Sequence, residues 1–352
     1  QRWVKSLKVH NFDIKLFTLL KPSKQSTKIF DELNVETITS NVKLNKNKLR
    51  TPNLSKLKYI QAQEIIKKII KSFCPDLVHA HYASSYGVLA YLSKFRPYIV
   101  SAWGSDIYDF PQRSFINKLL LKRVLLSANE VCSTSIAMSN VIKNNFKSIN
   151  VSIVPFGIDC DFFVPNKIPK EKFVVGTIKS IEEHNGIDCI IEAAYDVVFN
   201  HRKKIEFLIV GGGSLEYKMK EKVEKYNLKN SFNFAGHVPH KNVKDYYHKL
   251  SIFIAVSTRE SFGVSILEAA ACEIPSITSN VGGLKEVNKN NETGIVINAN
   301  DPRNLAESII RLYDDDDLRK KFGFNARKNV EENFNWDNNV NSMKTIYEKY
   351  IT

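Results

Sequence analysis

The sequence predicts an α/β protein of two Rossmann-like, doubly wound domains that face a cleft. Three observations support this prediction. Short β-rich runs alternate with amphipathic helical stretches, which is the pattern of β-α-β units and a mostly parallel sheet. The alternation is interrupted at residues 155–169, where Pro and Gly cluster, and then restarts. A chain of 352 residues with 43% hydrophobic content is also long enough to bury two cores.

The first domain is expected over residues 1–155. Five β-rich runs predict its first strands, at 12–20, 35–40, 76–81, 98–104 and 130–135. A short helical face occupies the start of the sequence, and we expect that a first strand and its loop are missing before it. Because that loop lies at the ligand cleft in a doubly wound sheet, part of the site is expected to be missing with it.

The second domain is expected over residues 156–335, after a β-rich run at 151–157. Six further runs predict its strands, at 173–178, 205–210, 232–235, 251–256, 275–278 and 294–297. Residues 336–352 are expected to form a C-terminal helix that returns to the first domain.

The excess of basic residues lies entirely in the first part of the chain. Residues 1–150 hold 24 Lys or Arg against 9 Asp or Glu, and residues 151–352 hold 27 against 28, which gives +15 and −1. This asymmetry favours an anionic membrane surface or a phosphate-bearing acceptor as the partner of the first domain, with the basic loop at 43–58 as the predicted membrane contact. No nucleic-acid-binding motif accompanies these residues, so nucleic acid is not an expected partner.

The sequence contains no run of roughly 18 to 20 apolar residues and no signal-peptide pattern at its start. A cytoplasmic protein, peripheral at the inner face of the plasma membrane, is therefore expected. The five cysteines are odd in number and widely spaced, which favours buried free thiols over disulfides or a zinc site.

The most informative segment is 256–271, V-S-T-R-E-S-F-G-V-S-I-L-E-A-A-A. A strand leads to Glu260, and a helix is predicted from Val264, so that its free N–H groups can bind an anion. Gly263 allows close approach of a phosphate or sugar. Glu268, in the second helical turn, can accept hydrogen bonds from a ribose diol, and Glu260 can bind sugar hydroxyls. The donor-binding residues expected here are Ser261, Phe262, Gly263, Val264 and Glu268.

This segment resembles glycosyltransferase family 4, in which two glutamates are separated by seven residues, as Glu260 and Glu268 are. The segments Q-R-W-V-K-S-L, H-A-H-Y-A-S-S-Y-G and W-G-S-D are also similar to that family. The resemblance implies the GT-B fold, transfer from a nucleoside-diphosphate sugar, retention of anomeric configuration, and no metal ion or other cofactor. The implied acceptor is a glycan or a polyprenyl-linked glycan of bacterial surface polysaccharide, such as lipopolysaccharide.

Departure of a nucleoside diphosphate needs nearby positive charge. The family places cations after the first strand of its second domain, where this sequence reads V-G-T-I-K-S-I-E-E-H-N-G. Lys179 is the expected catalytic cation. His184 stands where the family commonly has a lysine, and a histidine is a weaker, pH-dependent partner of a diphosphate.

A glycine run at 211–213 follows a predicted strand and precedes a helix, so Gly212 and Gly213 are expected at the donor. Tight-turn geometry is the alternative explanation. His237 follows the next strand, in a loop that lies beside the nucleotide base in the family.

The first domain offers a second set of residues at its strand ends. Strand alternation places His79 and His81 on one face, with His81 nearer the cleft, where it is expected to bind a substrate. Metal binding by the pair is the less favoured alternative. Asp106 is expected to orient an acceptor hydroxyl, and the acceptor is expected to contact Trp103, Gly104 and Ser105. Together with Lys179 and Glu260, His81 and Asp106 are the expected catalytic residues. The family often has histidine where Trp103 stands, so the catalytic role that a histidine could have there is not expected in this protein.

The Asp-Cys-Asp triplet at 159–161 resembles a metal-binding element of a different glycosyltransferase fold, but its place after P-F-G-I favours a turn. Two alternatives to an active transferase remain open. One is a nucleotide-sugar epimerase of the same fold, and the other is a non-catalytic nucleotide-sugar-binding homologue. A dinucleotide-dependent dehydrogenase is disfavoured, because the Gly-x-Gly-x-x-Gly spacing is absent.

Overall fold

The computed structural model describes residues 1–40, 55–166 and 168–351, which divide into two compact units. Unit 1 consists of residues 1–134, 139–154 and 340–352, and unit 2 of residues 135–138 and 155–339. The main division falls between Val154 and Pro155, beside the boundary expected from the sequence. The basic loop at 43–58, the predicted membrane contact, lies almost wholly outside the described residues.

Unit 1 contains a four-stranded parallel sheet in the order β3-β4-β5-β6 and a separate parallel pair, β1-β2. The strands are β1 Leu16–Thr18, β2 Thr37–Thr39, β3 Val78–His81, β4 Tyr98–Ala102, β5 Glu130–Ser133 and β6 Val151–Ile153. Each of the five runs predicted for this domain contains one of these strands, and β6 lies in the run at 151–157.

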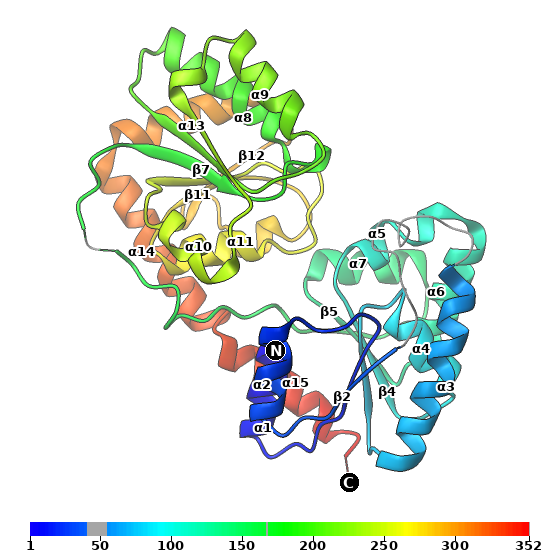
Figure 1. The fold of residues 1–352 in the computed structure, drawn as a ribbon. Coiled ribbons are helices and arrows are strands. Elements are labelled where there is room, and N and C mark those ends of the chain that lie inside the picture. Colours follow the sequence, from blue (N-terminus) through cyan, green and yellow to red (C-terminus); the bar gives the residue numbers. More distant parts are fainter. Residues whose placement is uncertain (41–54, 167, 352) are drawn as a thin grey trace. The chain divides into compact units, whose positions relative to one another are not determined.

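The helices of unit 1 cover both faces of its four-stranded sheet (Figure 1). They are α1 Arg2–Val9, α2 Lys24–Glu32, α3 Ser55–Phe73, α4 Tyr86–Ser93, α5 Ser105–Tyr108, α6 Phe115–Ser127, most of α7 Ile136–Asn145, and the second part of α15 Trp336–Glu348, with a 3-10 turn at Pro111–Arg113. Met343 and Tyr347 of α15 pack with Ile99 and Cys132 of the sheet and with α1. The C-terminal helix therefore completes the core of the N-terminal unit.

Unit 2 is built on a six-stranded parallel sheet in the order β12-β11-β10-β7-β8-β9. Its strands are β7 Val174–Ile178, β8 Glu206–Val210, β9 Phe232–Gly236, β10 Ile252–Ala255, β11 Ser276–Ser279 and β12 Gly294–Ile297. Each of the six runs predicted for this domain coincides with one strand, although β9 and β11 extend one residue beyond the predicted ranges. Every residue of β10 and β11 is buried, as expected when helices cover both faces of a parallel sheet.

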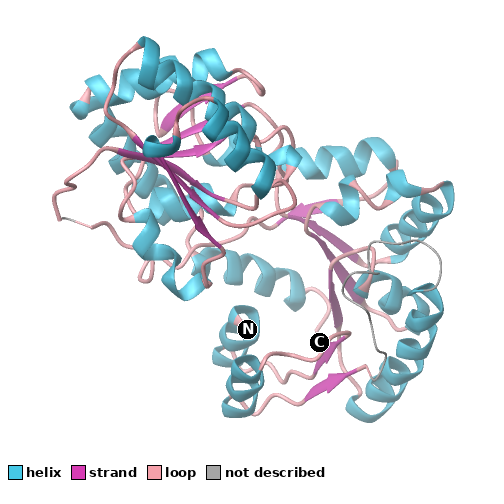
Figure 2. Cartoon of the chain, turned by 45° about the horizontal axis from the view of Figure 1, so that its top comes forward, coloured by secondary structure: helices cyan, strands magenta, loops and turns pink. Residues whose placement is uncertain are grey.

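Two layers of helices enclose this sheet, as Figures 1 and 2 show. The helices are α8 Ile187–Tyr195, α9 Glu216–Lys225, α10 His240–Tyr247, α11 Val264–Ala271, α12 Leu284–Val287, α13 Pro302–Asp314 and α14 Asp316–Asn333, with a π-helical turn at Asp196–Asn200 and 3-10 turns at Glu183–Asn185 and Lys229–Ser231. One core contains side chains of α8, α9 and α13, and the other contains side chains of α10, α11, α12 and α14.

The cysteines agree with the prediction except for Cys74. Cys132, Cys160, Cys189 and Cys272 are buried free thiols, whereas Cys74 is exposed just after α3.

Candidate active site

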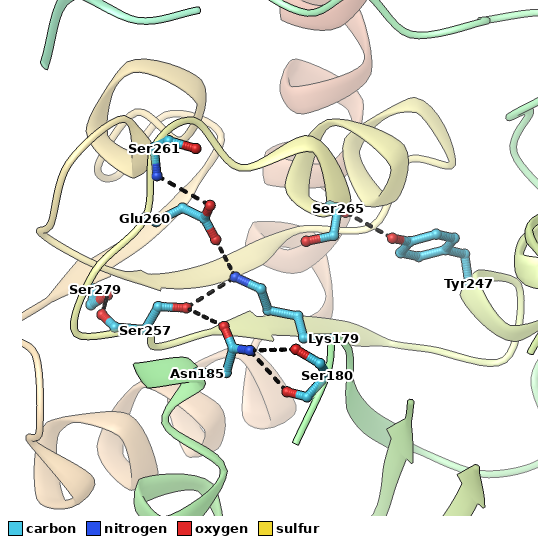
Figure 3. Close-up of polar contacts among 9 residues, drawn as sticks. All are labelled: Lys179, Ser180, Asn185, Tyr247, Ser257, Glu260, Ser261, Ser265 and Ser279. Atoms are coloured by element: carbon cyan, nitrogen blue, oxygen red, sulfur yellow. Dashed lines mark hydrogen bonds and ion pairs between the residues drawn. The ribbon is translucent and has the colours of Figure 1, made fainter. Parts of the chain in front are cut away.

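The candidate site in unit 2 is centred on Lys179 and Glu260. Lys179 follows β7 directly, and Glu260 lies in the loop from β10 to α11; the two strands are neighbours in the sheet. The Lys179 ammonium donates a hydrogen bond to a Glu260 carboxylate oxygen and forms an ion pair with it (Figure 3). Their side chains are 9% and 21% exposed, so the pair reaches the surface only at its edge. Parallel strands thus bring together two residues that are 81 positions apart.

A network of hydrogen-bonded polar side chains holds the Lys179 ammonium in place. Its ammonium also donates to Ser257 Oγ at 2.9 Å, and the Ser257 hydroxyl donates to Asn185 Oδ1 at 3.4 Å. The Asn185 amide donates to the carbonyl and the hydroxyl oxygen of Ser180, both at 2.9 Å. Ser257 and Asn185 are buried, so the network holds the cation from the side of the protein core (Figure 3). The sequence analysis assigned no role to either residue, although each lies within a segment that it singled out.

The loop that carries Glu260 is fixed by the segment after β11. The Ser279 hydroxyl donates to the Ser257 carbonyl at 2.5 Å, and the Gly283 amide donates to the Glu260 carbonyl at 3.3 Å. Gly282 has φ +48°, and a Cβ atom there would lie against the Glu260 carbonyl oxygen, well inside van der Waals contact. Only glycine fits this position without displacing the loop. The V-G-G sequence after a buried strand was the signal that could have identified it.

Glu268 lies in the second turn of α11 and is nearly buried. Its Oε2 accepts a hydrogen bond from the Tyr247 hydroxyl at 2.8 Å, and its Oε1 lies 3.2 Å from His240 Nε2. Burial, followed by the nearby Glu268 carboxylate, raises the pKa of Tyr247 well above its ordinary value, so the phenol stays a donor. Tyr247 therefore orients the carboxylate. Neither Tyr247 nor His240 was predicted, because both come from α10, distant in sequence.

The start of α11 has the geometry expected of an anion-binding turn. Gly263 precedes the helix with φ +111°, and its carbonyl accepts the amides of Ile266 and Leu267 at 3.0 and 3.4 Å, so the N–H groups left for a ligand in the first turn are those of Val264 and Ser265. Val264 is exposed, and Ser261 is partly exposed beside Glu260.

The prediction that Phe262 contacts a donor is wrong for its side chain. Phe262 is 1% exposed and packs between Phe156 and Phe334, with ring centroids 6.0 and 5.8 Å away. It anchors the loop in the core, and Ser261 before it remains partly exposed.

The glycines after β8 allow two loops to pack closely, and one of them also leaves room for a ligand. A Cβ atom at Gly211 would strike the Lys179 carbonyl, and one at Gly213 would strike the Ile181 carbonyl, whereas at Gly212 only the Glu216 carboxylate comes near. Gly213 is thus required by the close approach of two loops, which was the alternative kept open. Gly212 remains open to a ligand. His237 is exposed after β9.

His184 lies in a cavity of about 790 Å³ on the α8 side of unit 2. Glu182, Lys218, Thr258 and Arg259 are among its other lining residues. Lys179 does not line this cavity, so joint binding of one diphosphate by Lys179 and His184 stays a prediction.

In unit 1, His79 and His81 lie side by side, with ring centroids 4.0 Å apart, as strand alternation predicted. Both nitrogens of His79 are bonded, Nδ1 to the Tyr347 hydroxyl at 2.5 Å and Nε2 to Ser101 Oγ at 2.8 Å. The buried Nδ1 of His81 has no hydrogen-bond partner among the described residues. Burial lowers the pKa of His81 to about 4, and burial together with His81 lowers the pKa of His79. Both rings are therefore neutral near pH 7.

Asp106 is structural, which corrects its predicted contact with an acceptor. It is 0% exposed, and its carboxylate accepts backbone N–H bonds from Ala83 at 2.7 Å, Gly104 at 2.8 Å and Trp103 at 3.1 Å. It thereby joins the loops after β3 and β4. No face of the carboxylate is left for an acceptor hydroxyl.

The loop that Asp106 holds presents an indole and a hydroxyl. Trp103 is 41% exposed, and its ring meets His81 edge-on at 5.7 Å between centroids. Ser105 is exposed and hydrogen-bonds to the Tyr82 hydroxyl, while Gly104 is buried with φ +142°. Trp103 and Ser105 are thus the predicted acceptor residues whose side chains are accessible.

Within the described ranges, no group of three or more His, Cys, Asp or Glu side chains is placed to hold a metal ion. The Asp-Cys-Asp triplet forms a turn, as the sequence indicated, because Asp159 Oδ1 accepts the amides of Asp161 and Phe162 at 3.2 and 3.0 Å.

Both parts of the chain match models of glycosyltransferase families. Residues 161–329 match the model described as glycosyl transferases group 1, and residues 1–135 match the glycosyl transferase 4-like model. An uncharacterised glycosyltransferase of Methanocaldococcus jannaschii is 28% identical over 85% of this chain and 83% of its own length. The capsular polysaccharide biosynthesis glycosyltransferase CapM of Staphylococcus aureus is 27% identical over 67% of this chain and 66% of its own length. The N-acetyl-α-D-glucosaminyl L-malate synthase of Bacillus anthracis is 25% identical over 77% of this chain and 74% of its own length.

Solved structures share the fold over nearly the whole chain. Sucrose-phosphate synthase of Thermosynechococcus elongatus has a TM-score of 0.84 at 20% identity, over 99% of this chain and 91% of that one. HepE of Anabaena, in complex with UDP and glucose, has a TM-score of 0.78 at 15% identity, over 95% and 91%. At such identities the likeness concerns the fold.

Two parallel α/β units, with a Lys–Glu pair at the strand ends of unit 2 and a second glutamate in the helix that follows, are the fold and site of the GT-B class of glycosyltransferases. With both family models matched, the chain belongs to glycosyltransferase family 4, which confirms the predicted fold and family.

Proposed function

We propose that this glycosyltransferase moves a sugar from a nucleoside-diphosphate sugar to a hydroxyl of a glycan or lipid-linked acceptor, with retention of configuration. The observation that carries the proposal is the Lys179–Glu260 pair, beside the start of α11 and Glu268. HepE of Anabaena, which shares the fold, has been crystallised with UDP-glucose, and this supports a nucleotide-sugar donor.

In the proposed reaction, Lys179 stabilises the charge that develops on the leaving diphosphate. Glu260 then exchanges its bond to Lys179 for hydroxyls of the transferred sugar, and Glu268, oriented by Tyr247, accepts bonds from the ribose. The N–H groups at the start of α11 stabilise the phosphate further. Retention would proceed on one face of the sugar ring, with the departing phosphate helping to deprotonate the acceptor. These residues supply the positive charge and the hydroxyl contacts, and the proposal includes no metal ion.

The acceptor is assigned to unit 1, at Trp103 and Ser105 beside His81. A neutral imidazole suits this role, since it binds a hydroxyl without adding a charge. Asp106 contributes by holding the loop and not by contact.

The proposed setting is bacterial surface polysaccharide synthesis, including lipopolysaccharide, at the cytoplasmic face of the membrane. The name of the S. aureus relative, which refers to capsular polysaccharide, supports it. Within the described part of the chain, no helix is both long and apolar enough to cross a bilayer. Contact with an anionic membrane through unit 1 is therefore proposed as peripheral.

The test is nucleotide release from UDP-, GDP- and ADP-sugars, measured for the wild type and for Lys179→Ala, Glu260→Ala and Lys172→Ala. Lys172 is the matched control, because it pairs with Glu206 at 3.1 Å but is 72% exposed and remote from the strand ends that carry the site. Release that depends on Lys179 and Glu260 but not on Lys172 would support the proposal and identify the donor. Nucleotide binding without release from any donor would favour a non-catalytic homologue. Conversion of the sugar without transfer would favour an epimerase.

A further inference from the structure

The outer face of α6 in unit 1 carries an unusual amount of exposed apolar surface. Phe115 is 80% exposed, Ile116 66%, Leu126 48% and Leu119 41%. Elsewhere among the described residues, large exposed apolar side chains are scattered one or two to an element. Such a concentration marks a contact surface.

The geometry of α6 gathers these side chains into one stripe. At 100° per residue, Phe115, Leu119 and Leu126 fall within about 40° of one another, and Ile116 lies on the edge of the same face. The opposite face holds Leu121 and Val124, both fully buried, and packs beside α4 (Figure 1).

Capping fixes which side chains point outward at the start of the helix. The Ser114 hydroxyl accepts the Asn117 amide at 3.2 Å, so α6 begins at Phe115. Asn117 turns inward, and its side-chain amide donates to the Phe110 carbonyl at 3.3 Å. Phe115 and Ile116 therefore project from the exposed first turn.

Positive charge flanks the stripe. Residues 111–127 contain Arg113, Lys118, Lys122 and Arg123, all exposed, and no Asp or Glu. On the helical wheel, Lys118 and Lys122 lie on one side of the stripe, and Arg123 lies near its other edge, between Leu119 and Ile116. A helix with an apolar stripe between cations fits an interface that has apolar chains beneath anionic headgroups.

We infer that α6 is the membrane-docking element of this transferase, with the stripe of Phe115, Ile116, Leu119 and Leu126 inserted among the acyl chains of an anionic bilayer. Lys118, Lys122 and Arg123 contact the lipid phosphates. This inference rests on the proposed peripheral membrane contact and assigns it to a described helix instead of the basic loop at 43–58. A second copy of the chain would suit the apolar stripe, but the cations along it, which are all of one sign, oppose self-association.

The experiment is co-sedimentation of the full chain with vesicles of phosphatidylcholine alone and of phosphatidylcholine mixed with phosphatidylglycerol. One variant carries Phe115→Ser and Ile116→Ser, and a second carries Lys118→Gln, Lys122→Gln and Arg123→Gln. The matched control carries Tyr217→Ser and Phe324→Ser in unit 2, which are 80% and 61% exposed. Nucleotide release from the sugar donor is measured for each variant in the absence of vesicles.

We expect the wild type to bind the phosphatidylglycerol vesicles and to be released by salt. Each α6 variant should bind at least about tenfold more weakly, and the control should bind like the wild type. Wild-type binding that survives in both α6 variants, or no wild-type binding, overturns the inference. A dimer in solution that Phe115→Ser dissociates overturns it in favour of self-association. Because nucleotide release needs no vesicles, loss of docking and failure of the proposed transferase reaction give different results.

Discussion

The ammonium of Lys179 is shared between the Glu260 carboxylate and Ser257 Oγ, so the expected phosphate-binding cation and the expected sugar-binding carboxylate form one unit. A diphosphate that takes Lys179 frees Glu260 for the sugar. The two halves of the donor are thereby recognised together.

This coupling predicts strong non-additivity. Lys179→Ala and Glu260→Ala should each lower kcat by about 100-fold, and the double variant should lose little more than either single variant. A double-mutant cycle on nucleotide release measures the coupling. If the two losses multiply, the residues act independently and the shared role assigned to the pair is wrong.

Tyr247→Phe should weaken nucleotide binding. It removes the donor that holds Glu268 Oε2 and leaves a buried carboxylate oxygen with one hydrogen bond fewer. We expect KM for the donor to rise severalfold and stability to fall by about 1 to 2 kcal/mol. Calorimetric titration with the nucleotide and urea denaturation check both values, and an unchanged affinity would remove Glu268 from the nucleotide site.

Asp106→Asn and Asp106→Ala should lower the free energy of unfolding, with a smaller effect on kcat. The substitution disturbs three backbone hydrogen bonds in a fully buried site, which costs about 2 to 3 kcal/mol. The exposed Asp76→Asn in the same unit is the control, with no expected change. Urea denaturation gives the free energies. Full stability with no activity would restore a direct role for Asp106 at the acceptor.

Stability should rise with pH between about 4 and 6.5. The folded pKa of His81 lies at about 4, below its ordinary value, so within this window the unfolded chain binds a proton that the folded chain does not. At pH 4 up to about 3 kcal/mol is lost relative to pH 7. Urea denaturation at several pH values should show this slope for the wild type and for the exposed His201→Gln, and a shallower slope for His81→Gln. Equal slopes in all three proteins would contradict the assignment to His81.

Gly282→Ala should displace Glu260. A methyl group there meets the Glu260 carbonyl oxygen, whereas at Gly236, which also has positive φ, it meets nothing within 4 Å. Both variants carry the backbone strain of about 1 kcal/mol, and only Gly282→Ala adds the collision. Comparing their unfolding free energies isolates the collision, and Gly282→Ala should also lose at least about tenfold in kcat.

The sequence predicted every strand of the two main sheets, because in a parallel sheet covered on both faces each strand is a short apolar run between helices. It also indicated the polar residues at the ends of those strands. Strand order was not accessible, so the bond between Lys179 and Glu260 and the roles of Tyr247 and Gly282 appeared only in the fold. Side-chain direction within a loop was equally hidden. Phe262 turns into the core and Asp106 binds backbone amides, although both were expected to contact a substrate.

The return of α15 to unit 1 has a consequence for synthesis on the ribosome. The Tyr347 hydroxyl is hydrogen-bonded to His79, and Met343 and Ile346 pack in one core with Ile99 and Cys132. The unit that is translated first therefore cannot close its core until residues 340–351 have emerged, after the whole of unit 2. Unit 2 needs nothing beyond residue 339, so it can finish folding earlier, although its translation begins later.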